Sequence, residues 1–119
     1  NKKFKQIKRI KQEEKNYNIF CYIDKIKNKV ALTKKHDLGF LDNFYLPPIK
    51  EATIKNKIKN WKFHSNFKNS ISNKKLNINL YYKFSSKLPL QSQWFSLKGN
   101  NEFIPSFTKK IFKQILEIN

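Results

Sequence analysis

Hydrophobic and polar residues alternate along much of this chain, and a period of two residues is typical of β-strands with one buried face. The alternation is clearest between residues 76 and 83, and it puts these side chains on one face: Leu76, Ile78, Leu80 and Tyr82. Comparable β-rich runs predict strands at 17–23, 29–35, 61–67 and 93–97. A polar turn joins the first two of these strands as a hairpin.

Two other segments have the spacing of three and four residues that is typical of an amphipathic helix. Thr53 can cap a short helix that runs towards Trp61 with one apolar face. A final helix is predicted after Pro105, with Ser106 or Thr108 as its N-cap. Its apolar face would consist of Phe107, Ile111, Phe112, Ile115, Leu116 and Ile118. Strands, a short helix, more strands and a last helix predict an α+β domain.

The remaining segments have the composition of connections. Residues 39–48 end in two prolines, which do not fit inside a helix or a central strand. Residues 69–73 are rich in Asn and Ser and predict a loop. Residues 1–16 are dense in lysine and predict a basic connector, and residues 17–119 predict one domain. Because the chain starts with Asn1 and has no Met, we expect it to be a piece of a longer protein.

The chain has a formal net charge of +18, which favours binding to nucleic acid, because each contacted phosphate releases counterions. A second explanation is equally open. Of the 26 basic residues only Arg9 is an arginine, and the abundant Lys, Asn and Ile are the residues that an A+T-rich genome encodes by default. A surface that evolved to bind phosphates would be expected to contain more arginine.

Residues that could carry catalysis or hold a metal are sparse. Cys21 stands alone in an apolar run, which predicts a buried thiol and no disulfide framework. His36 and His64 have no ligand pattern around them and are interpreted as surface or partly buried polar groups. The two glycines cannot form a phosphate-binding loop. With neither a signal peptide nor an apolar run long enough for a membrane span, we expect a cytoplasmic protein without a membrane partner.

Residues 32–48 resemble a stretch of the C-terminal domain of A/G-specific adenine DNA glycosylases of the MutY type. Lys34 and Lys35 take the positions of a K-R pair, and residues 39–41 take those of G-L-L. Tyr45 takes the position of an aromatic residue and Pro48 that of the closing proline. The departures are Asn43 for a second glycine and Leu46-Pro47 for E-F.

Three further segments match this family in the same order. They are the lysine-rich lead-in to Tyr17, the segment 69–76 that resembles H-x-F-S-H-x-x-L, and the ending at 93–97 and 105–112. The resemblance implies a Nudix-like fold, in which a mixed β-sheet is flanked by helices, and a domain that recognises 8-oxoguanine in double-stranded DNA. It also implies a glycosylase domain in cis that excises adenine from 8-oxoguanine:adenine mispairs and carries a 4Fe–4S cluster. The chain itself would be non-catalytic and nucleoid-associated.

The resemblance assigns lesion recognition to Ile71, Ser72 and Asn73, which take the positions of F-S-H. 8-Oxoguanine differs from guanine by a carbonyl at C8 and an N–H at N7. One hydroxyl can hydrogen-bond to either altered group, because it both donates and accepts. Asn73 keeps hydrogen-bonding capacity but has no ring, and Ile71 keeps apolar bulk. The alternative is that residues 69–73 are an ordinary polar turn.

Several lysines are predicted to contact the DNA backbone, which would position the domain without specifying sequence. They are Lys34, Lys35, Lys68, Lys74 and Lys75, in addition to the basic arm at 1–15. The alternative for each is a solvated surface lysine. Four large aromatic residues are interpreted as core and not as platforms for bases, because each lies on an apolar face of a predicted element. These are Tyr45, Trp61, Trp94 and Phe107.

Two other functions stay open as alternatives. A Nudix pyrophosphohydrolase needs a cluster of glutamates to hold divalent metal ions, but Tyr45 stands where the first is expected. Residues 52–101 contain neither Asp nor Glu, and Glu51 alone cannot form such a site. The second alternative is a small basic RNA- or ribosome-binding protein, which only the charge favours.

Overall fold

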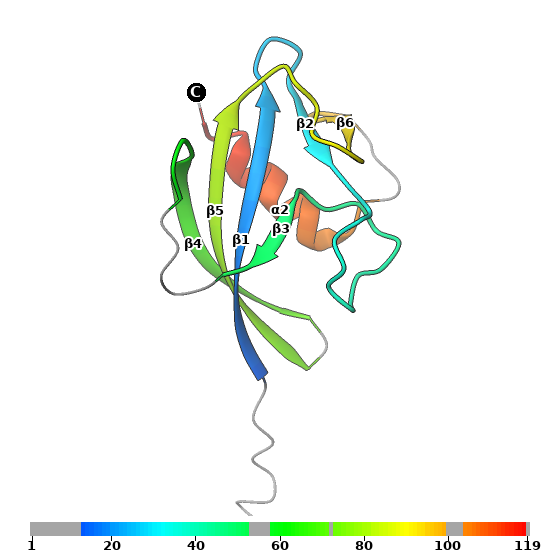
Figure 1. Ribbon diagram of the computed structural model, residues 1–119, viewed down its shortest axis with the longest axis vertical. Coiled ribbons are helices and arrows are strands. Elements are labelled where there is room, and N and C mark those ends of the chain that lie inside the picture. The colour runs from blue at the N-terminus through cyan, green and yellow to red at the C-terminus, as the bar shows by residue number, and fades with distance from the viewer. Residues whose placement is uncertain (1–12, 53–57, 72, 100–103, 119) are drawn as a thin grey trace, which may run out of the picture.

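The computed structural model describes residues 13–52, 58–71, 73–99 and 104–118. In these residues the chain forms a six-stranded sheet and one helix (Figure 1). The strands are β1 (Glu13–Asp24), β2 (Lys29–Leu32), β3 (Ile49–Glu51), β4 (Lys62–Ile71), β5 (Lys74–Phe84) and β6 (Gln93–Ser96). The helix is α2 (Ser106–Ile115). The prediction of one α+β domain is therefore confirmed at the level of fold class.

The sheet is mixed, because β1 pairs in parallel with β5 and antiparallel with β2 and β3. The strand order is β4-β5-β1-β2-β6, and β3 pairs with β1 off this path. The parallel pair runs from Glu13 opposite Lys74 to Ile23 opposite Phe84. Two strands that are far apart in the chain thus form the centre of the sheet, and the predicted hairpin of β1 and β2 is confirmed.

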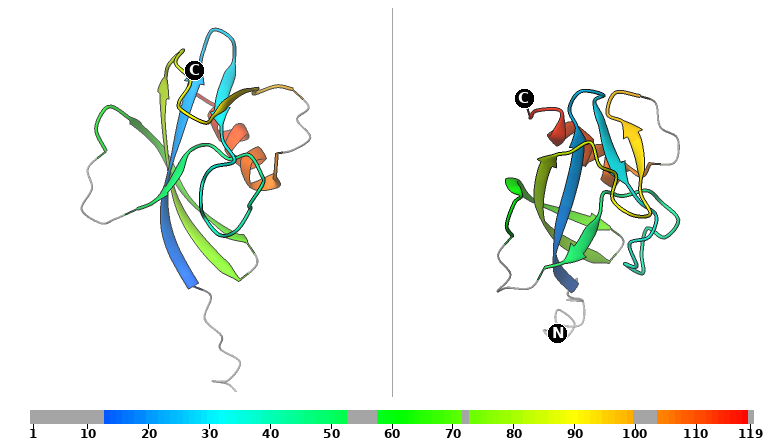
Figure 2. Two further views of the ribbon diagram at one scale, coloured as in Figure 1. Left: turned by 45° about the vertical axis from the view of Figure 1, so that its right-hand side comes forward. Right: turned by 45° about the horizontal axis from the view of Figure 1, so that its top comes forward.

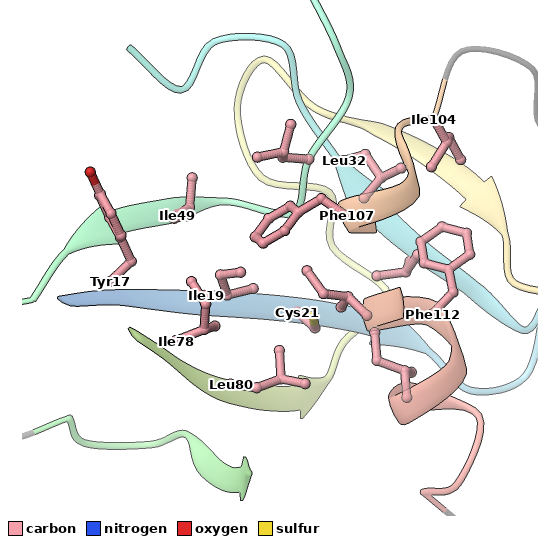
Figure 3. Packing of buried hydrophobic residues seen from close by; sticks show 14 of the residues in the cluster. Tyr17, Ile19, Cys21, Leu32, Ile49, Ile78, Leu80, Ile104, Phe107 and Phe112 are labelled. Carbon is pink, nitrogen blue, oxygen red and sulfur yellow. The ribbon is translucent and has the colours of Figure 1, made fainter. Parts of the chain in front are cut away.

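The core lies between one face of the sheet and α2, which packs across that face (Figures 2 and 3). Leu76, Ile78 and Leu80 are at most 1% exposed, which confirms the predicted buried face of this strand. Phe107 and Ile111 of α2 belong to the same buried cluster. Because burying an aliphatic side chain contributes about 1.5–3 kcal/mol, the apolar face of α2 accounts for its position on the sheet.

The start of α2 differs from the prediction. Its N-cap is Pro105 and no side chain caps it by a hydrogen bond, so the expectation that Ser106 or Thr108 is the N-cap was wrong. Thr108 is fully buried and donates its hydroxyl to the carbonyl oxygen of Tyr45, at 2.8 Å. The hydroxyl serves this tertiary contact because the packing of α2 brings the loop before β3 against it.

Two strands are longer than predicted. β1 begins at Glu13, so residues 13–16, which were assigned to the basic connector, lie in the sheet. There Asn16 stands opposite Asn77, whose side-chain amide donates to its Oδ1 atom at 2.7 Å. β4 continues to Ile71, so the predicted loop at 69–73 was wrong for its first three residues. Partner strands satisfy the backbone at these polar strand ends, which a pattern of hydrophobicity does not detect.

Other boundaries differ as well. β2 ends at Leu32, and Thr33 forms only an isolated bridge with Leu46, so the strand predicted at 29–35 is too long. β3 was not predicted, because three residues are too few to show an alternating pattern. The predicted helix after Thr53 falls largely on residues 53–57, which lie outside the described residues, and residues 58–60 are not helical.

Candidate nucleic-acid interface

The end of the β4–β5 hairpin contains the residues that the resemblance assigned to lesion recognition. Ile71 pairs with Lys74 as the last pair of this ladder, so only positions 72 and 73 connect the two strands. Ile71 is partly buried and packs against the core, whereas Asn73 is exposed. Ser72 lies outside the described residues. The connection between the paired strands is therefore shorter than the loop that the sequence predicted at 69–73.

A hollow of about 260 Å³ lies beside this turn. Its walls come from the loop before β3, the last residues of β4 and the start of α2. The lining residues are Leu41, Asn69, Ser70, Ile71, Pro105, Ser106, Phe107 and Lys110. Three segments that the resemblance matched separately, 39–41, 69–76 and 105–112, thus meet around one hollow, although they are far apart in the sequence.

The wall formed by α2 is electropositive. The first turn of the helix contains no acidic residue, and its backbone N–H groups at the N-terminus have no side-chain cap. Unpaired N–H groups and the helix dipole give such an end a partial positive charge. Lys110 adds a full charge, and its Nζ donates to Oδ1 of Asn69 at 2.9 Å. The hollow can therefore accept a ligand with oxygen acceptors or negative charge.

Three of the predicted backbone-contacting lysines lie close to the hairpin end. Lys68 is exposed on β4, and its Nζ is 3.9 Å from Oε2 of Glu14, which is a loose, solvent-screened pair. Lys74 and Lys75 are half-buried at the start of β5, and the Nζ of Lys74 lies 5.8 Å from the centre of the Phe40 ring. Because side chains alternate along a strand, Lys74 and Lys75 flank the turn on opposite faces of the sheet.

Lys34 and Lys35, the other two predicted contacts, occupy a different part of the surface. Both are exposed and follow β2. The Nζ of Lys34 lies 5.0 Å from the centre of the Tyr45 ring, and the backbone N–H of Lys35 donates to Oγ1 of Thr33 at 2.9 Å. The fold therefore gathers Lys68, Lys74 and Lys75 at the hairpin end and places this pair on the β2 side of the sheet.

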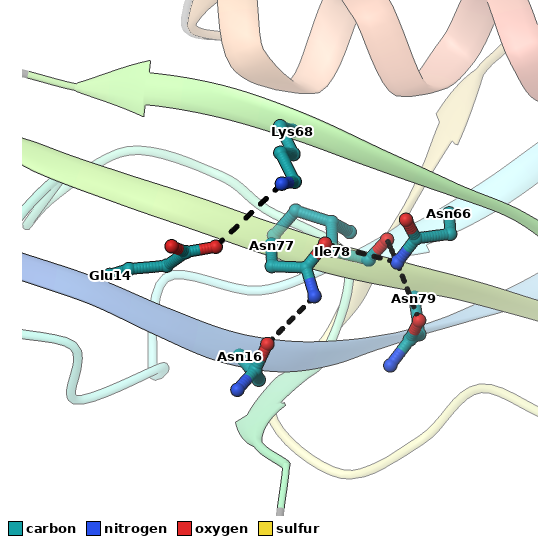
Figure 4. A network of polar contacts seen from close by, with 7 residues as sticks. All are labelled: Glu14, Asn16, Asn66, Lys68, Asn77, Ile78 and Asn79. Atoms are coloured by element: carbon teal, nitrogen blue, oxygen red, sulfur yellow. Dashed lines mark hydrogen bonds and ion pairs between the residues drawn. The ribbon is translucent and has the colours of Figure 1, made fainter.

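A row of asparagines crosses the sheet face that points away from α2 (Figure 4). The amide of Asn66 donates to Oδ1 of Asn77 at 3.1 Å and to Oδ1 of Asn79 at 2.8 Å. The row continues onto β1, where Asn77 and Asn79 donate to Oδ1 of Asn16 and of Asn18. The sequence showed Asn77 and Asn79 on one strand face, but their partners on β1 and β4 depend on the sheet order.

The same face carries an aromatic cluster that sequence reasoning missed. Trp61 was interpreted as core, but it lies on this outer face, 5.0 Å from the Phe20 ring and 4.9 Å from the Tyr22 ring between centroids. Phe107 is buried as predicted, and Tyr45 packs partly buried against the core. Trp94 is half-buried on β6. Trp61 was misassigned because it precedes β4, and the described residues 58–61 are not helical.

Side chains with nucleophilic or ligating chemistry are kept apart. Cys21 is fully buried, as predicted, and this burial raises the pKa of its thiol well above the ordinary range. His36 is buried, and its Nε2 is 3.3 Å from the carbonyl oxygen of Phe44. The Nδ1 of His64 is 2.9 Å from Oγ of Ser65, which donates to Gln114. Within the described residues, no three His, Cys, Asp or Glu side chains are grouped to hold a metal ion.

Membrane insertion by a helix has no support in the described part of the chain, where no helix is both long and apolar enough to cross a bilayer.

No protein-family model matches this chain, and no curated protein matches it either.

Proposed function

We propose that this chain is the 8-oxoguanine recognition domain of a MutY-type adenine DNA glycosylase, with a Nudix-like fold and no catalytic machinery of its own. The observation that carries the proposal is the hollow beside the β4–β5 turn. Leu41, Ile71 and Phe107 all line it, and each comes from a different segment that resembles this family. If these three resemblances had arisen by chance, the matched residues would not be expected to line the same hollow.

Recognition of the damaged base would depend on the turn itself. Ser72 stands at the position of the family's serine, and its hydroxyl can accept from the N7–H of 8-oxoguanine or donate to the carbonyl at C8. Exposed Asn73 offers a second donor and acceptor beside it. A short connection between two paired strands suits this role, because the strands on either side limit the entropy lost when a hydrogen bond to the base forms.

The DNA backbone would be held by the charges around this turn. Lys68, Lys74 and Lys75 are near enough to the hairpin end to contact phosphates on either side of the lesion. Lys110 and the positive end of α2 extend the basic surface on the far side of the hollow. Such contacts supply affinity that falls with salt and leave base discrimination to the turn.

The whole protein would contain a glycosylase domain in cis, which carries the 4Fe–4S cluster and hydrolyses the N-glycosidic bond of adenine. It would act in the cytoplasm on nucleoid DNA. The hydrolase alternative lacks ligands, because residues 52–101 contain no carboxylate and Glu51 is exposed at the end of β3. The RNA-binding alternative is favoured by the charge alone.

The test compares the affinity of the chain for a duplex with an 8-oxoguanine:adenine pair and for the same duplex with guanine:adenine. The Ser72→Ala variant should reduce the preference for the lesion by about two-fold to a hundred-fold, because a lost hydrogen bond costs about 0.5–3 kcal/mol. Ser86→Ala is the matched control, since Ser86 is exposed in the connection after β5. An unchanged preference in Ser72→Ala would make the turn an ordinary connection and refute this function for it.

A further inference from the structure

Five aromatic rings lie together on the sheet face opposite α2, at the other end of β4 and β5 from the turn. We call these residues the aromatic face: Phe20, Tyr22, Trp61, Phe63 and Tyr81. The rings contact one another, with Phe20 stacked on Tyr81 at 5.8 Å and Phe63 edge-on to Tyr81 at 5.6 Å between centroids. Phe20 and Tyr22 both meet Trp61 edge-on. The cluster spans β1, β5 and the start of β4.

The aromatic face is accessible to a ligand. Phe63 is 55% exposed, and none of the five rings belongs to the buried core on the α2 side. Trp61 separates two hollows of about 350 and 400 Å³. The first is lined by Phe20, Tyr22, Pro48 and Ile58 among others, and the second by Asn60, Lys62, Lys83 and Phe84. A flat ring that entered either hollow would therefore contact the Trp61 indole.

The charge around these rings is strongly positive. The Nζ of Lys83 lies 4.7 Å from the centre of the Trp61 ring and 5.4 Å from that of Tyr22. Lys62 lines the second hollow, and Lys50 lines the first together with Glu51. Since β4 and β5 contain no acidic residue, the charge of these lysines is not neutralised within the two strands. A partner for this face should offer flat apolar rings joined by negative charges.

We propose that the aromatic face binds single-stranded nucleic acid, with unpaired bases stacked on Trp61 and Phe63 and phosphates bound by Lys50 and Lys83. Stacking on aromatic side chains combined with a basic groove is how proteins bind single strands without reading sequence. A duplex does not suit this face, because its bases are stacked on one another and cannot reach the rings. The eight steps from Phe63 to Ile71 span roughly 26 Å of strand, so this contact is separate from the β4–β5 turn.

Tryptophan fluorescence can test the contact, because the chain contains two tryptophans and one is on the aromatic face. The Trp94→Phe variant leaves Trp61 as the only tryptophan, and its emission can be excited selectively over that of the tyrosines. Titration with a roughly ten-nucleotide oligothymidylate should quench this emission. Inorganic polyphosphate, a polyanion without bases, should leave it nearly unchanged. Polarisation of a labelled oligonucleotide shows when the chain is saturated. Unchanged tryptophan emission at saturation would overturn the proposal, and equal quenching by polyphosphate would overturn it as well.

Substitutions in the otherwise unchanged chain provide a second measurement that does not depend on the Trp94 variant. Phe63→Ala should weaken binding of labelled oligothymidylate by about five-fold or more, because base stacking contributes about 1–3 kcal/mol per base. Phe44→Ala is the matched control, since Phe44 is 44% exposed in the loop before β3. Lys83→Gln should lower the affinity for oligothymidylate and make the slope of log affinity against log salt concentration shallower by about 0.7. Lys98→Gln, elsewhere on the surface, is the matched control.

Equal affinity of Phe63→Ala and the unsubstituted chain would show that lysines bind the strand by charge alone, which overturns the proposal. The result does not depend on lesion recognition. A chain that prefers the 8-oxoguanine duplex but binds oligothymidylate without Phe63 would retain the proposed function and lose this inference. A chain that binds oligothymidylate through Phe63 but shows no preference for the 8-oxoguanine duplex would support this inference and contradict the proposed function.

Discussion

Thr108, in the first turn of α2, donates its hydroxyl to the backbone carbonyl of Tyr45 at 2.8 Å, and thereby ties the helix to the loop that leads into β3. The Thr108 side chain is fully buried. The same loop carries Leu41, which lines the hollow beside the β4–β5 turn. This one hydrogen bond therefore connects two walls of the candidate interface.

Replacing Thr108 by Val should destabilise the domain, because the shape is kept while the carbonyl of Tyr45 loses its partner. A buried acceptor left unsatisfied costs about 1–3 kcal/mol. Urea unfolding followed by circular dichroism measures the change. Ser106→Ala should alter stability by less than about 0.5 kcal/mol, because Ser106 is exposed and does not cap the helix. Equal effects of the two substitutions would contradict the role assigned to Thr108.

Cys21 should make stability decline at alkaline pH. Burial raises the pKa of its thiol above the value of about 8.5 that is typical of an unfolded chain. Below pH 8.5 the thiol is protonated in both states, whereas above it only the unfolded state releases the proton. Stability relative to Cys21→Ala should therefore fall by about 2 kcal/mol between pH 8.5 and 10. Unfolding curves of both proteins across this range provide the measurement, and parallel pH profiles would refute it.

Lys74 should affect affinity without affecting discrimination. In Lys74→Ala, binding to the 8-oxoguanine duplex and to the guanine duplex should weaken by the same factor, because a phosphate contact carries no information about the base. The slope of log affinity against log salt should become shallower by about 0.9. Fluorescence anisotropy at several salt concentrations measures both, with Lys98→Ala as the control. A changed ratio between the two duplexes would assign Lys74 to base recognition.

The chain should not hydrolyse 8-oxo-dGTP or other nucleoside diphosphate derivatives in the presence of Mg²⁺ or Mn²⁺. Hydrolysis of this kind requires several hard oxygen ligands around the metal ion. Residues 52–101 supply none from Asp or Glu. Release of pyrophosphate or phosphate, followed by a coupled assay, is the measurement. Turnover above that of a heat-denatured sample would contradict the proposed non-catalytic role.

The buried strand of residues 76–82 could be predicted because its signal is local. Leu76, Ile78 and Leu80 alternate with polar residues, and one buried face with a period of two requires only that the segment is extended. The apolar face of α2 is local in the same way, since Phe107, Ile111 and Ile115 are spaced by helical turns. The strand face is buried as predicted, and so are Phe107, Ile111 and Ile115 of α2. Leu116, which was predicted on the same helix face, follows the end of α2 and is 43% exposed, so that part of the prediction was wrong.

Positions whose structure depends on a distant partner could not be predicted in this way. Asn16 is polar and still lies in a strand, because β5 supplies its backbone partner and Asn77 supplies its side-chain partner. Trp61 fits a helical face in the sequence, but its actual contacts are Phe20 and Tyr22 on another strand. Nothing near either residue in the chain encodes these pairings.

The sequence by itself determined the fold class, the buried faces and the local residue types of the candidate interface, because periodicity and composition act over a few neighbouring residues. Only the tertiary structure decided which of those residues meet. The parallel pairing of β1 with β5 and the packing of α2 bring Leu41, Ile71 and Phe107 around one hollow and gather five rings on the opposite face. Such contacts arise because distant segments share one core, and the free energy of that core depends on the whole chain.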